Sequence, residues 1–434
     1  MRRALLTFVP PPVMFVLCGL FLGCGAPVPA DGPADFTPIS EPGFDAADNA
    51  ADRNDYPWAM TYFKPDDRDS GQLYVGTGNA IRLAGFLERI FGLPPDPWHP
   101  PEIRRYQPAE GPQSWERVLD WRDVENGPPW QTTGVRALSS YRVPSSGQTY
   151  LYAGTFGTQP TLWRSRTGDP GTWEAVWSNP MEGSIRSLAV HNEILYVAVT
   201  HESKGLHTPG EIHATDGQAV WPVMTDGFGS ANNFGVYVLA SFNGWLYAGT
   251  MNLIQGYEVW KLAGPDGQAP PVRIIAHGGT SRAQHAVGDM RVFQDRLYVA
   301  SLILGAEFSL VAAADMLRID DHDRVEVVVG HNSVGGVPSG FGYPHNAYLW
   351  CLEEHRGKLY CGTWNMSNVF SVTDRYGARL YASEDGVSWY EVVKGGLGGR
   401  SFAVRDMVST GDTLYLGLAN ILNNKGLRIW AMTE

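Results

Sequence analysis

Three arginines recur at one position in this chain and could together bind an anion. Arg186 and Arg405 each lie ten residues before the tyrosine of a repeated Leu-Tyr pair, and Arg136 is equivalent once a longer turn is allowed for. A guanidinium can hold a carboxylate or phosphate through two parallel hydrogen bonds, so three converging arginines would form an anion clamp. In the structural alternative, each arginine bonds carbonyl or acidic groups of a neighbouring repeat, with Asp289 and Asp406 as candidate partners.

A second set of polar residues follows the same Leu-Tyr pair at a constant distance. Five residues after the tyrosine, four of the seven repeats carry asparagine and one carries histidine; these are Asn79, Asn252, Asn365, Asn420 and His201. Such a ring could line a ligand site. Alternatively, each asparagine bonds its own turn, for which its short amide side chain is well suited.

Two further histidines, His285 and His345, lie in segments that lead into the first strand of a repeat. They are candidates for ligand contact, and hydrogen bonding between repeats is the structural alternative.

The four cysteines divide into two pairs. Cys18 and Cys24 belong to the N-terminal segment, whereas Cys351 and Cys361 flank two strands joined by a glycine-containing turn. If the latter two faced each other across that hairpin, their Cα atoms would lie roughly 4.5–5.5 Å apart, within reach of a disulfide. The alternative is a pair of buried free thiols that pack as small apolar side chains.

Charge and motifs exclude several classes of function. The formal net charge of −12 argues against a nucleic-acid partner, because phosphate backbones are bound by basic surfaces. The sequence contains no glycine-rich phosphate loop, no GxSxG, no HExxH and no EF-hand spacing. We therefore expect neither a cofactor nor a metal ion.

The element that positions all these residues is the motif Leu-Tyr-Xaa-Gly-Thr. Four close copies and three looser ones begin at Leu73, Leu151, Leu246, Leu359, Leu195, Leu297 and Leu414. Each has the period-two pattern of a strand covered on both faces. The glycine is expected where another backbone approaches closely.

The spacing of the motif predicts a four-stranded repeat. An inner strand and a tight turn precede each copy, and a third strand and a fourth with the pattern Trp-Xaa-Xaa-apolar follow most copies. Seven such repeats predict an all-β domain over 36–434, a seven-bladed β-propeller of four-stranded antiparallel blades. The expected blades are near 56–121, 134–178, 184–224, 235–276, 287–330, 345–394, and 403–434 plus 36–40.

Hairpins between third and fourth strands carry a recognisable turn. Residues 383–389 read Ser-Glu-Asp-Gly-Val-Ser-Trp and residues 167–173 read Thr-Gly-Asp-Pro-Gly-Thr-Trp, with a weaker copy from Thr215 to Trp221. In this the chain resembles the Asp-box, or sialidase-type repeat, β-propellers. The resemblance implies that the aspartate closes a structural turn and that the tryptophan packs beneath it. It also implies that an arginine triad could bind an anionic sugar, although no Arg-Ile-Pro motif and no Tyr/Glu nucleophile pair is found.

Both ends of the chain carry specific expectations. The last repeat is one strand short, and residues 36–40 could supply that strand, which would close the ring. Residues 1–23 have a basic start and an apolar run that predict a signal peptide, and Cys24 resembles a bacterial lipidation site. Residues 24–35 would then be a flexible tether to the membrane.

One insertion, 79–101, interrupts the repeat rhythm. Residues 81–91 have helical spacing of apolar side chains, so this segment could form a lid, a docking surface or a simple cover. Taken together, the sequence predicts a monomeric, exported cell-envelope protein that binds a carbohydrate, peptide or protein without catalysis. The alternative is a glycan hydrolase or lyase acting on an anionic sugar.

Overall fold

The computed structural model describes residues 36–44, 54–79, 100–127, 130–201, 208–262, 269–304, 313–365, 377–397, 401–420 and 426–433. The predicted signal peptide, the tether with Cys24, and nearly all of the insertion 79–101 lie outside these ranges. Within them, no helix is long and apolar enough to cross a membrane.

The described residues form an all-β structure with one large sheet of 28 antiparallel strands. We refer to its consecutive groups of four strands as units 1 to 7. Units 1 to 4 consist of β2 (Tyr56–Phe63), β3 (Gln72–Gly78), β4 (Glu102–Tyr106) and β5 (Trp115–Asp120); β6 (Thr132–Val143), β7 (Gln148–Gly157), β8 (Thr161–Ser165) and β9 (Trp173–Ser178); β10 (Gly183–His191), β11 (Ile194–Thr200), β12 (Glu211–Thr215) and β13 (Val220–Met224); and β14 (Gly235–Phe242), β15 (Trp245–Met251), β16 (Val259–Leu262) and β17 (Val272–Ile275).

Units 5 to 7 continue the pattern, and the only described helical turns are very short. The strands are β18 (Ala286–Phe293), β19 (Arg296–Leu302), β20 (Met316–Ile319) and β21 (Val325–Val329); β22 (Tyr348–His355), β23 (Lys358–Trp364), β24 (Leu380–Ser383) and β25 (Tyr390–Val393); and β26 (Ala403–Thr410), β27 (Thr413–Ala419), β28 (Arg428–Thr433) and β1 (Phe36–Pro38). The described helical turns are η2 (Pro108–Glu110), α2 (Trp121–Val124) and η4 (Ser339–Gly342).

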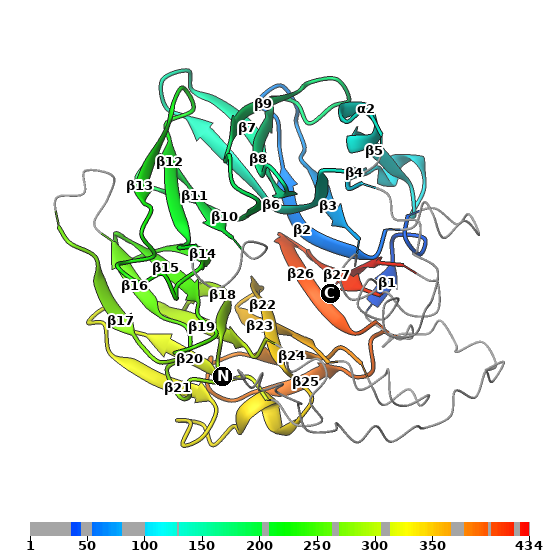
Figure 1. The fold of residues 1–434 in the computed structure, drawn as a ribbon. Helices are drawn as coiled ribbons and strands as arrows, with labels where there is room; N and C mark the ends of the chain where they lie inside the picture. Colours follow the sequence, from blue (N-terminus) through cyan, green and yellow to red (C-terminus); the bar gives the residue numbers. More distant parts are fainter. Residues whose placement is uncertain are drawn as a thin grey trace, which may run out of the picture.

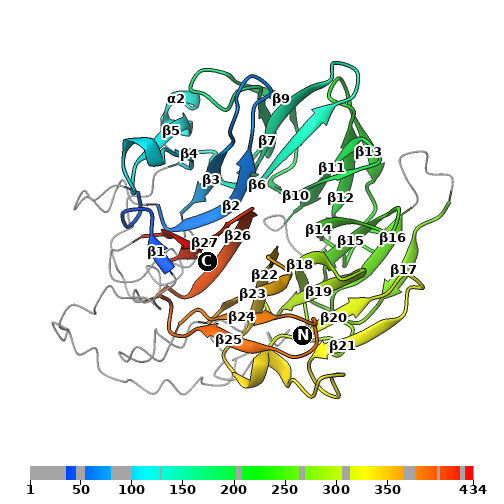
Figure 2. The same ribbon diagram turned by 180° about the vertical axis from the view of Figure 1, so that it is seen from behind.

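The units follow one another around a common centre, with the first strand of each nearest the middle (Figures 1 and 2). The second strand of each of units 1 to 6 joins the first strand of the next unit through a short bridge, such as Trp364 with Ala403. Among the described residues, the strands of units 7 and 1 do not pair with each other. There the backbone N–H of Asn420 donates to the carbonyl of Asp55 at 3.1 Å, and β26 and β27 lie against β2.

The N-terminal strand completes the last unit, as predicted. β1 pairs antiparallel with β28, with Phe36 opposite Met432. The backbone N–H of Ile39 donates to the carbonyl of Ile429 at 2.9 Å, and the Ser40 hydroxyl accepts from the N–H of Ile429. The two ends of the described chain therefore share one unit.

The repeated motif packs neighbouring units against each other and fixes the strand that follows. A Cβ built on Gly154 would lie 2.3 Å from the Ile185 side chain of the next unit, which confirms that the motif glycine permits close approach. The motif threonine has a separate task, since the hydroxyl of Thr250 accepts from the backbone N–H of Glu258 at 2.9 Å. It thereby fixes the start of the third strand.

The outer hairpins show the turn expected from the resemblance in two places and a different use of aspartate in a third. Asp216 Oδ1 accepts from the backbone N–H groups of Gln218 and Ala219 at 2.9 and 3.1 Å. Asp385 Oδ1 accepts from the backbone N–H groups of Val387 and Ser388 at 2.8 and 2.7 Å. Asp169, at the equivalent place in unit 2, instead forms ion pairs with Arg68 and Arg105 of unit 1. The aspartate can thus close a turn or join two units.

Of the two alternatives for Cys351 and Cys361, a disulfide and a pair of buried free thiols, the structure shows the second. Arg356 and Gly357 form a two-residue turn with positive φ, which sets the register of the hairpin. That register places Cys361 opposite Leu352 and Cys351 opposite Gly362. Because successive residues of a strand point to opposite faces, the two thiols do not meet.

Candidate functional site

Every inner strand contains a β-bulge at the same level, and β6 has a second one at Thr133. The shared bulge places one unpaired residue per unit near the centre. These seven residues, named here the bulge ring, are Trp58, Arg136, Arg186, Tyr237, Gly288, Trp350 and Arg405. A bulge re-aims a side chain and commonly adjoins functional sites. The three arginines predicted from the sequence all occupy bulge positions.

Each arginine of the ring lies over an aromatic side chain of a neighbouring unit. Arg136 Cζ is 4.4 Å from the Trp58 ring centroid, and Arg186 Cζ is 4.1 Å from that of Tyr237. Arg405 Cζ is 4.8 Å from the ring centroid of Trp350. Arg136 also lies over Phe156 of its own unit, at 4.7 Å. All four distances are ones at which the ring quadrupole attracts the cation.

Arg405 differs from other buried arginines of the described chain. Its residue surface is 8% exposed, its Nε has no acceptor, and its guanidinium forms no ion pair with a described residue. Arg104 and Arg105 are equally buried, yet both bond carboxylates. Burial lowers the pKa of Arg405, and the nearby charge of Arg136 adds to that effect. A buried cation without a hydrogen-bonded partner is costly, which makes Arg405 a candidate anion ligand.

The two acids proposed as arginine partners serve the backbone instead. Asp289 and Asp406 each follow a bulge, and each accepts backbone N–H groups with both oxygens. Asp289 Oδ2 accepts from Leu352 of unit 6 at 2.7 Å. Burial raises the pKa of both carboxyls, that of Asp406 to about 7, although Arg405 opposes the change.

The asparagines at the ends of second strands are buried and hydrogen-bonded. Asn252 Oδ1 accepts from the backbone N–H groups of Ile254 and Gln255, and its Nδ2 donates to Asn233 at 2.9 Å. These contacts match the structural alternative for this position. The others are placed similarly, with 4% exposure or less: Asn79, Asn365 and Asn420.

The three candidate histidines do not come together in one site. His201 is fully buried and lies 3.4 Å from Glu211, which His213 also contacts. Burial alone would raise the pKa of Glu211, but hydrogen bonds from the two histidines outweigh it and lower the pKa to about 2. His285 contacts the carbonyl of Leu304 at 3.0 Å. His345 is half-buried and has no side-chain hydrogen bond to a described residue.

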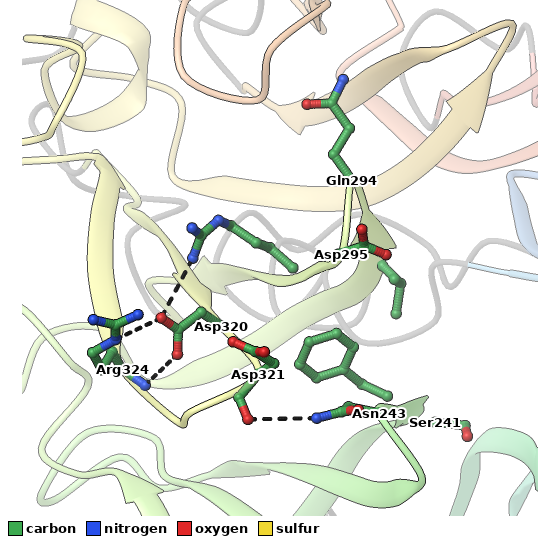
Figure 3. Close-up of a pocket in the computed structure, with 10 residues that line it drawn as sticks. Ser241, Asn243, Gln294, Asp295, Asp320, Asp321 and Arg324 are labelled. Atoms are coloured by element: carbon green, nitrogen blue, oxygen red, sulfur yellow. Dashed lines mark hydrogen bonds and ion pairs between the residues drawn. The ribbon is translucent and has the colours of Figure 1, made fainter.

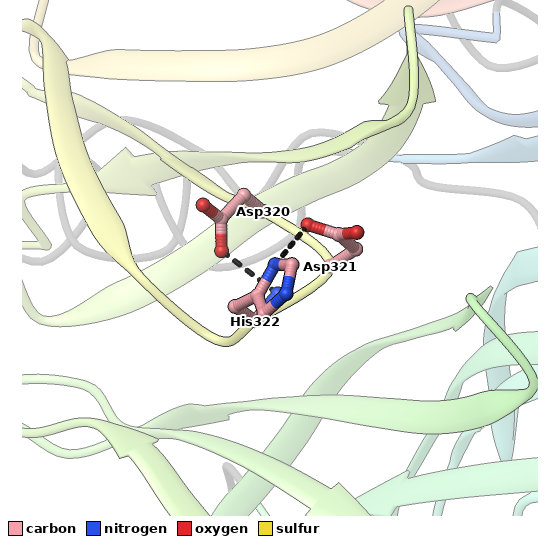
Figure 4. Close-up of side chains that lie close together, drawn as sticks. All are labelled: Asp320, Asp321 and His322. Carbon is pink, nitrogen blue, oxygen red and sulfur yellow. Dashed lines mark hydrogen bonds and ion pairs between the residues drawn. The ribbon is translucent and has the colours of Figure 1, made fainter.

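An open groove of about 540 Å³ lies beside the hairpin turns of units 4 and 5 (Figure 3). Its wall includes Asn243, whose side chain donates to the carbonyl of Asp321 at 3.4 Å. Beside the groove, the structure brings together three side chains of types that can bind a metal ion: Asp320, Asp321 and His322 (Figure 4). Among the described residues this is the one such group. Asp320 already accepts the backbone N–H groups of His322 and Arg324, so it closes a turn.

A second pocket, of about 490 Å³, lies among residues 313 and 330–344. The sequence reasoning missed this site and its neighbour Asp315, because no motif marks them. It also missed the aromatic members of the bulge ring. Aligning the inner strands on the Leu-Tyr pair would have placed Trp58, Tyr237 and Trp350 at the level of the arginines, but the cation–π pairing needs the fold.

No protein-family model matches the sequence, and a search of curated proteins finds no match. The functional argument for this chain therefore rests on its own residues and their geometry.

Proposed function

We propose that the seven units form a seven-bladed β-propeller closed by β1. Units 7 and 1 pack as the other neighbours do: a Cβ on Gly417 would lie 2.5 Å from Met60, just as one on Gly154 would meet Ile185. The hydrogen bond between Asn420 and Asp55 supports the same junction. In this arrangement the bulge ring surrounds the central axis.

The proposed function is that of a non-enzymatic binding protein whose ligand carries an anionic group. The single observation that carries this proposal is Arg405, a buried guanidinium that rests on Trp350 and forms no hydrogen bond to a described residue. An arriving carboxylate would supply the missing acceptors, and the aromatic surface would hold the guanidinium in place. An acidic carbohydrate, or a peptide or protein carboxylate, has the required chemistry.

The glycan hydrolase or lyase alternative has less support. Glycoside hydrolysis needs a pair of carboxyl groups, one as acid and one as base or nucleophile. The charges of Asp289 and Asp406 both raise the pKa of Arg405. Each of these two carboxylates uses both oxygens to accept hydrogen bonds from backbone N–H groups. Those hydrogen bonds would have to break before either group could act on a substrate.

The place of action is proposed from the N-terminal sequence alone. Residues 1–23 would direct export, lipid on Cys24 would hold the protein at the cell envelope, and 24–35 would act as a tether. Membrane fractionation with a lipid-labelling assay tests this. The wild type should be labelled and sediment with membranes, whereas Cys24→Ser should be unlabelled; equal labelling of both proteins would contradict the proposal.

Binding is tested with the full-length protein against an array of neutral and acidic oligosaccharides and carboxylate-bearing peptides. Arg405→Gln should weaken the binding of an acidic ligand about 10- to 100-fold, as expected for loss of charged hydrogen bonds worth roughly 1.5–3 kcal/mol. The matched control Arg324→Gln, on the hairpin side, should bind as the wild type does. Equal affinity of Arg405→Gln and wild type would refute the site. Cleavage of an acidic sugar, lost in Arg405→Gln, would favour the enzyme.

A further inference from the structure

One position recurs at the start of the third strand and carries a buried acid in four units. The four acids, at most 7% exposed, are Glu102, Glu211, Glu258 and Asp315. In units 1, 4 and 5 the backbone N–H of this residue donates to the motif hydroxyl, as Asp315 does to Ser301 at 3.0 Å. The position is therefore set by the repeat, and its partners can be compared between units.

In units 1 and 4 this acid is neutralised by an arginine of the fourth strand. Glu258 lies 2.8 Å from Arg273, and Glu102 lies 3.3 Å from Arg117. The two arginines occupy the same register, each opposite the residue two places after the acid. Glu102 additionally pairs with Arg104 of its own strand and with Arg122, each at 2.7 Å.

Units 3 and 6 neutralise the position by other means. In unit 3, histidines surround Glu211, with His213 at 2.7 Å. In unit 6 the charges are exchanged, because Arg379 stands at the acid position and pairs with Glu391 at the fourth-strand position. A charged pair or a histidine contact at this level is thus present in four of the seven units: 1, 3, 4 and 6.

In unit 5 the buried acid has no such partner. Register places Val327 where Arg117 and Arg273 stand in the other units. Asp315 is 6% exposed and accepts a hydrogen bond from the Thr280 hydroxyl, but its Oδ1 has no partner and no described cation pairs with it. Burial raises the pKa of Asp315, opposed in part by the hydroxyls of Ser339 and Thr280.

The unpartnered oxygen borders the pocket of about 490 Å³. Gly330 and Ser339 both line this pocket. A Cβ built on Gly330 would lie 3.2 Å from Asp315 Oδ1 and 2.9 Å from the Val327 side chain. Gly330 therefore adjoins both the acid and Val327, the residue that stands where the other units have arginine. Oδ1 is itself buried, and Gly330, which has no side chain, lies between it and the pocket.

We propose that this pocket binds the cationic group of a ligand, an ammonium or guanidinium, with Asp315 as its counter-ion. The ligand cation takes the place that Arg273 and Arg117 fill within their own units. The hydroxyl of Ser339 and the pocket backbone provide further polar contacts around the entering group. A buried carboxylate is stable when paired, and unit 5 supplies every part of the pair except the cation. This site is independent of the anion site proposed at Arg405.

The test is calorimetric titration of the full-length protein with methylguanidinium and ethylammonium chloride at constant ionic strength. Saturable binding is expected in the wild type and should fall at least tenfold in Asp315→Asn. Val327→Arg restores the internal ion pair, so it should abolish binding. The matched control Val325→Arg adds the same charge two residues away on an exposed site of the same strand and should bind as wild type.

The outcomes separate clearly. No saturable binding in the wild type, or equal binding in wild type and Asp315→Asn, would overturn the proposal. So would saturation by calcium chloride but by neither organic cation, because that would make the site a metal site. Circular dichroism of each variant identifies any that fail to fold, and Asp315→Asn and Val327→Arg test the site independently of each other.

Discussion

Asp406 Oδ2 accepts a hydrogen bond of 2.6 Å from the backbone N–H of Met60, although 346 positions separate the two residues. The bond joins the inner strands of units 7 and 1, whose described strands do not pair with each other. Asp289 makes the same contact between units 5 and 6, and the Ser187 hydroxyl does so between units 3 and 4. In these three units the residue after the bulge therefore serves as a latch between inner strands.

This latch predicts a specific dependence of stability on pH. Burial raises the pKa of Asp406 to about 7, above its ordinary value of 3.8, so the unfolded chain loses this proton first as pH rises. The free energy of unfolding should fall between about pH 4 and pH 7, by up to roughly 4 kcal/mol from this group. Asp406→Asn removes the titration, so urea unfolding should show its stability improving relative to wild type from pH 5 to pH 8. Parallel pH curves for the two proteins would contradict this.

The motif glycine predicts a steric coupling between units. Gly154→Ala places a methyl group against Ile185 and should lower the free energy of unfolding by about 1–3 kcal/mol through overpacking. Ile185→Ala removes Cγ2, the closest clashing atom, and leaves Cβ at 2.7 Å, so the double variant should be more stable than the sum of the single effects predicts. Chemical denaturation of the four proteins measures this coupling. Strict additivity would mean that the two residues do not compete for the same space.

Much of the fold could be predicted because its signals are local. Alternation around the Leu-Tyr pair and turn residues such as Asn243-Gly244 locate the hairpins, and the missing last strand points to Phe36–Pro38. The turn at Asp385 could likewise be predicted, since its hydrogen bonds lie within four residues. The cysteine register could not, because a shift of one residue in turn length reverses the face of each side chain.

The candidate site was less accessible from the sequence because its geometry is long-range. The positions of the three arginines could be predicted, but their stacking on aromatic rings of other units depends on how the units pack. The missing partner of Asp315 could not be predicted from the sequence, because it depends on the strand register that puts Val327 at the arginine position. In each case the partner lies on another strand, at a distance that no motif encodes.

The register of the hairpin predicts the chemistry of the two internal cysteines. Burial raises the pKa of the thiols of Cys351 and Cys361 well above the ordinary value, so few thiolates are available to react. Both should resist a thiol reagent in the folded protein and react once urea unfolds it. Non-reducing peptide mapping should recover both as free thiols, and a peptide pair joined through them would show that the register is different.

The strand β1 predicts that a short N-terminal deletion affects the whole domain. Phe36 and Ile39 are 6% and 5% exposed, and burial of two such side chains contributes roughly 3–6 kcal/mol. Deleting residues 36–40 should therefore lower the free energy of unfolding by several kcal/mol and expose the edge of β28. Deleting residues 26–30 is the matched control, because these lie in the predicted tether. Thermal unfolding of both proteins decides: an unchanged melting temperature after removal of 36–40 would show that β28 does not need β1.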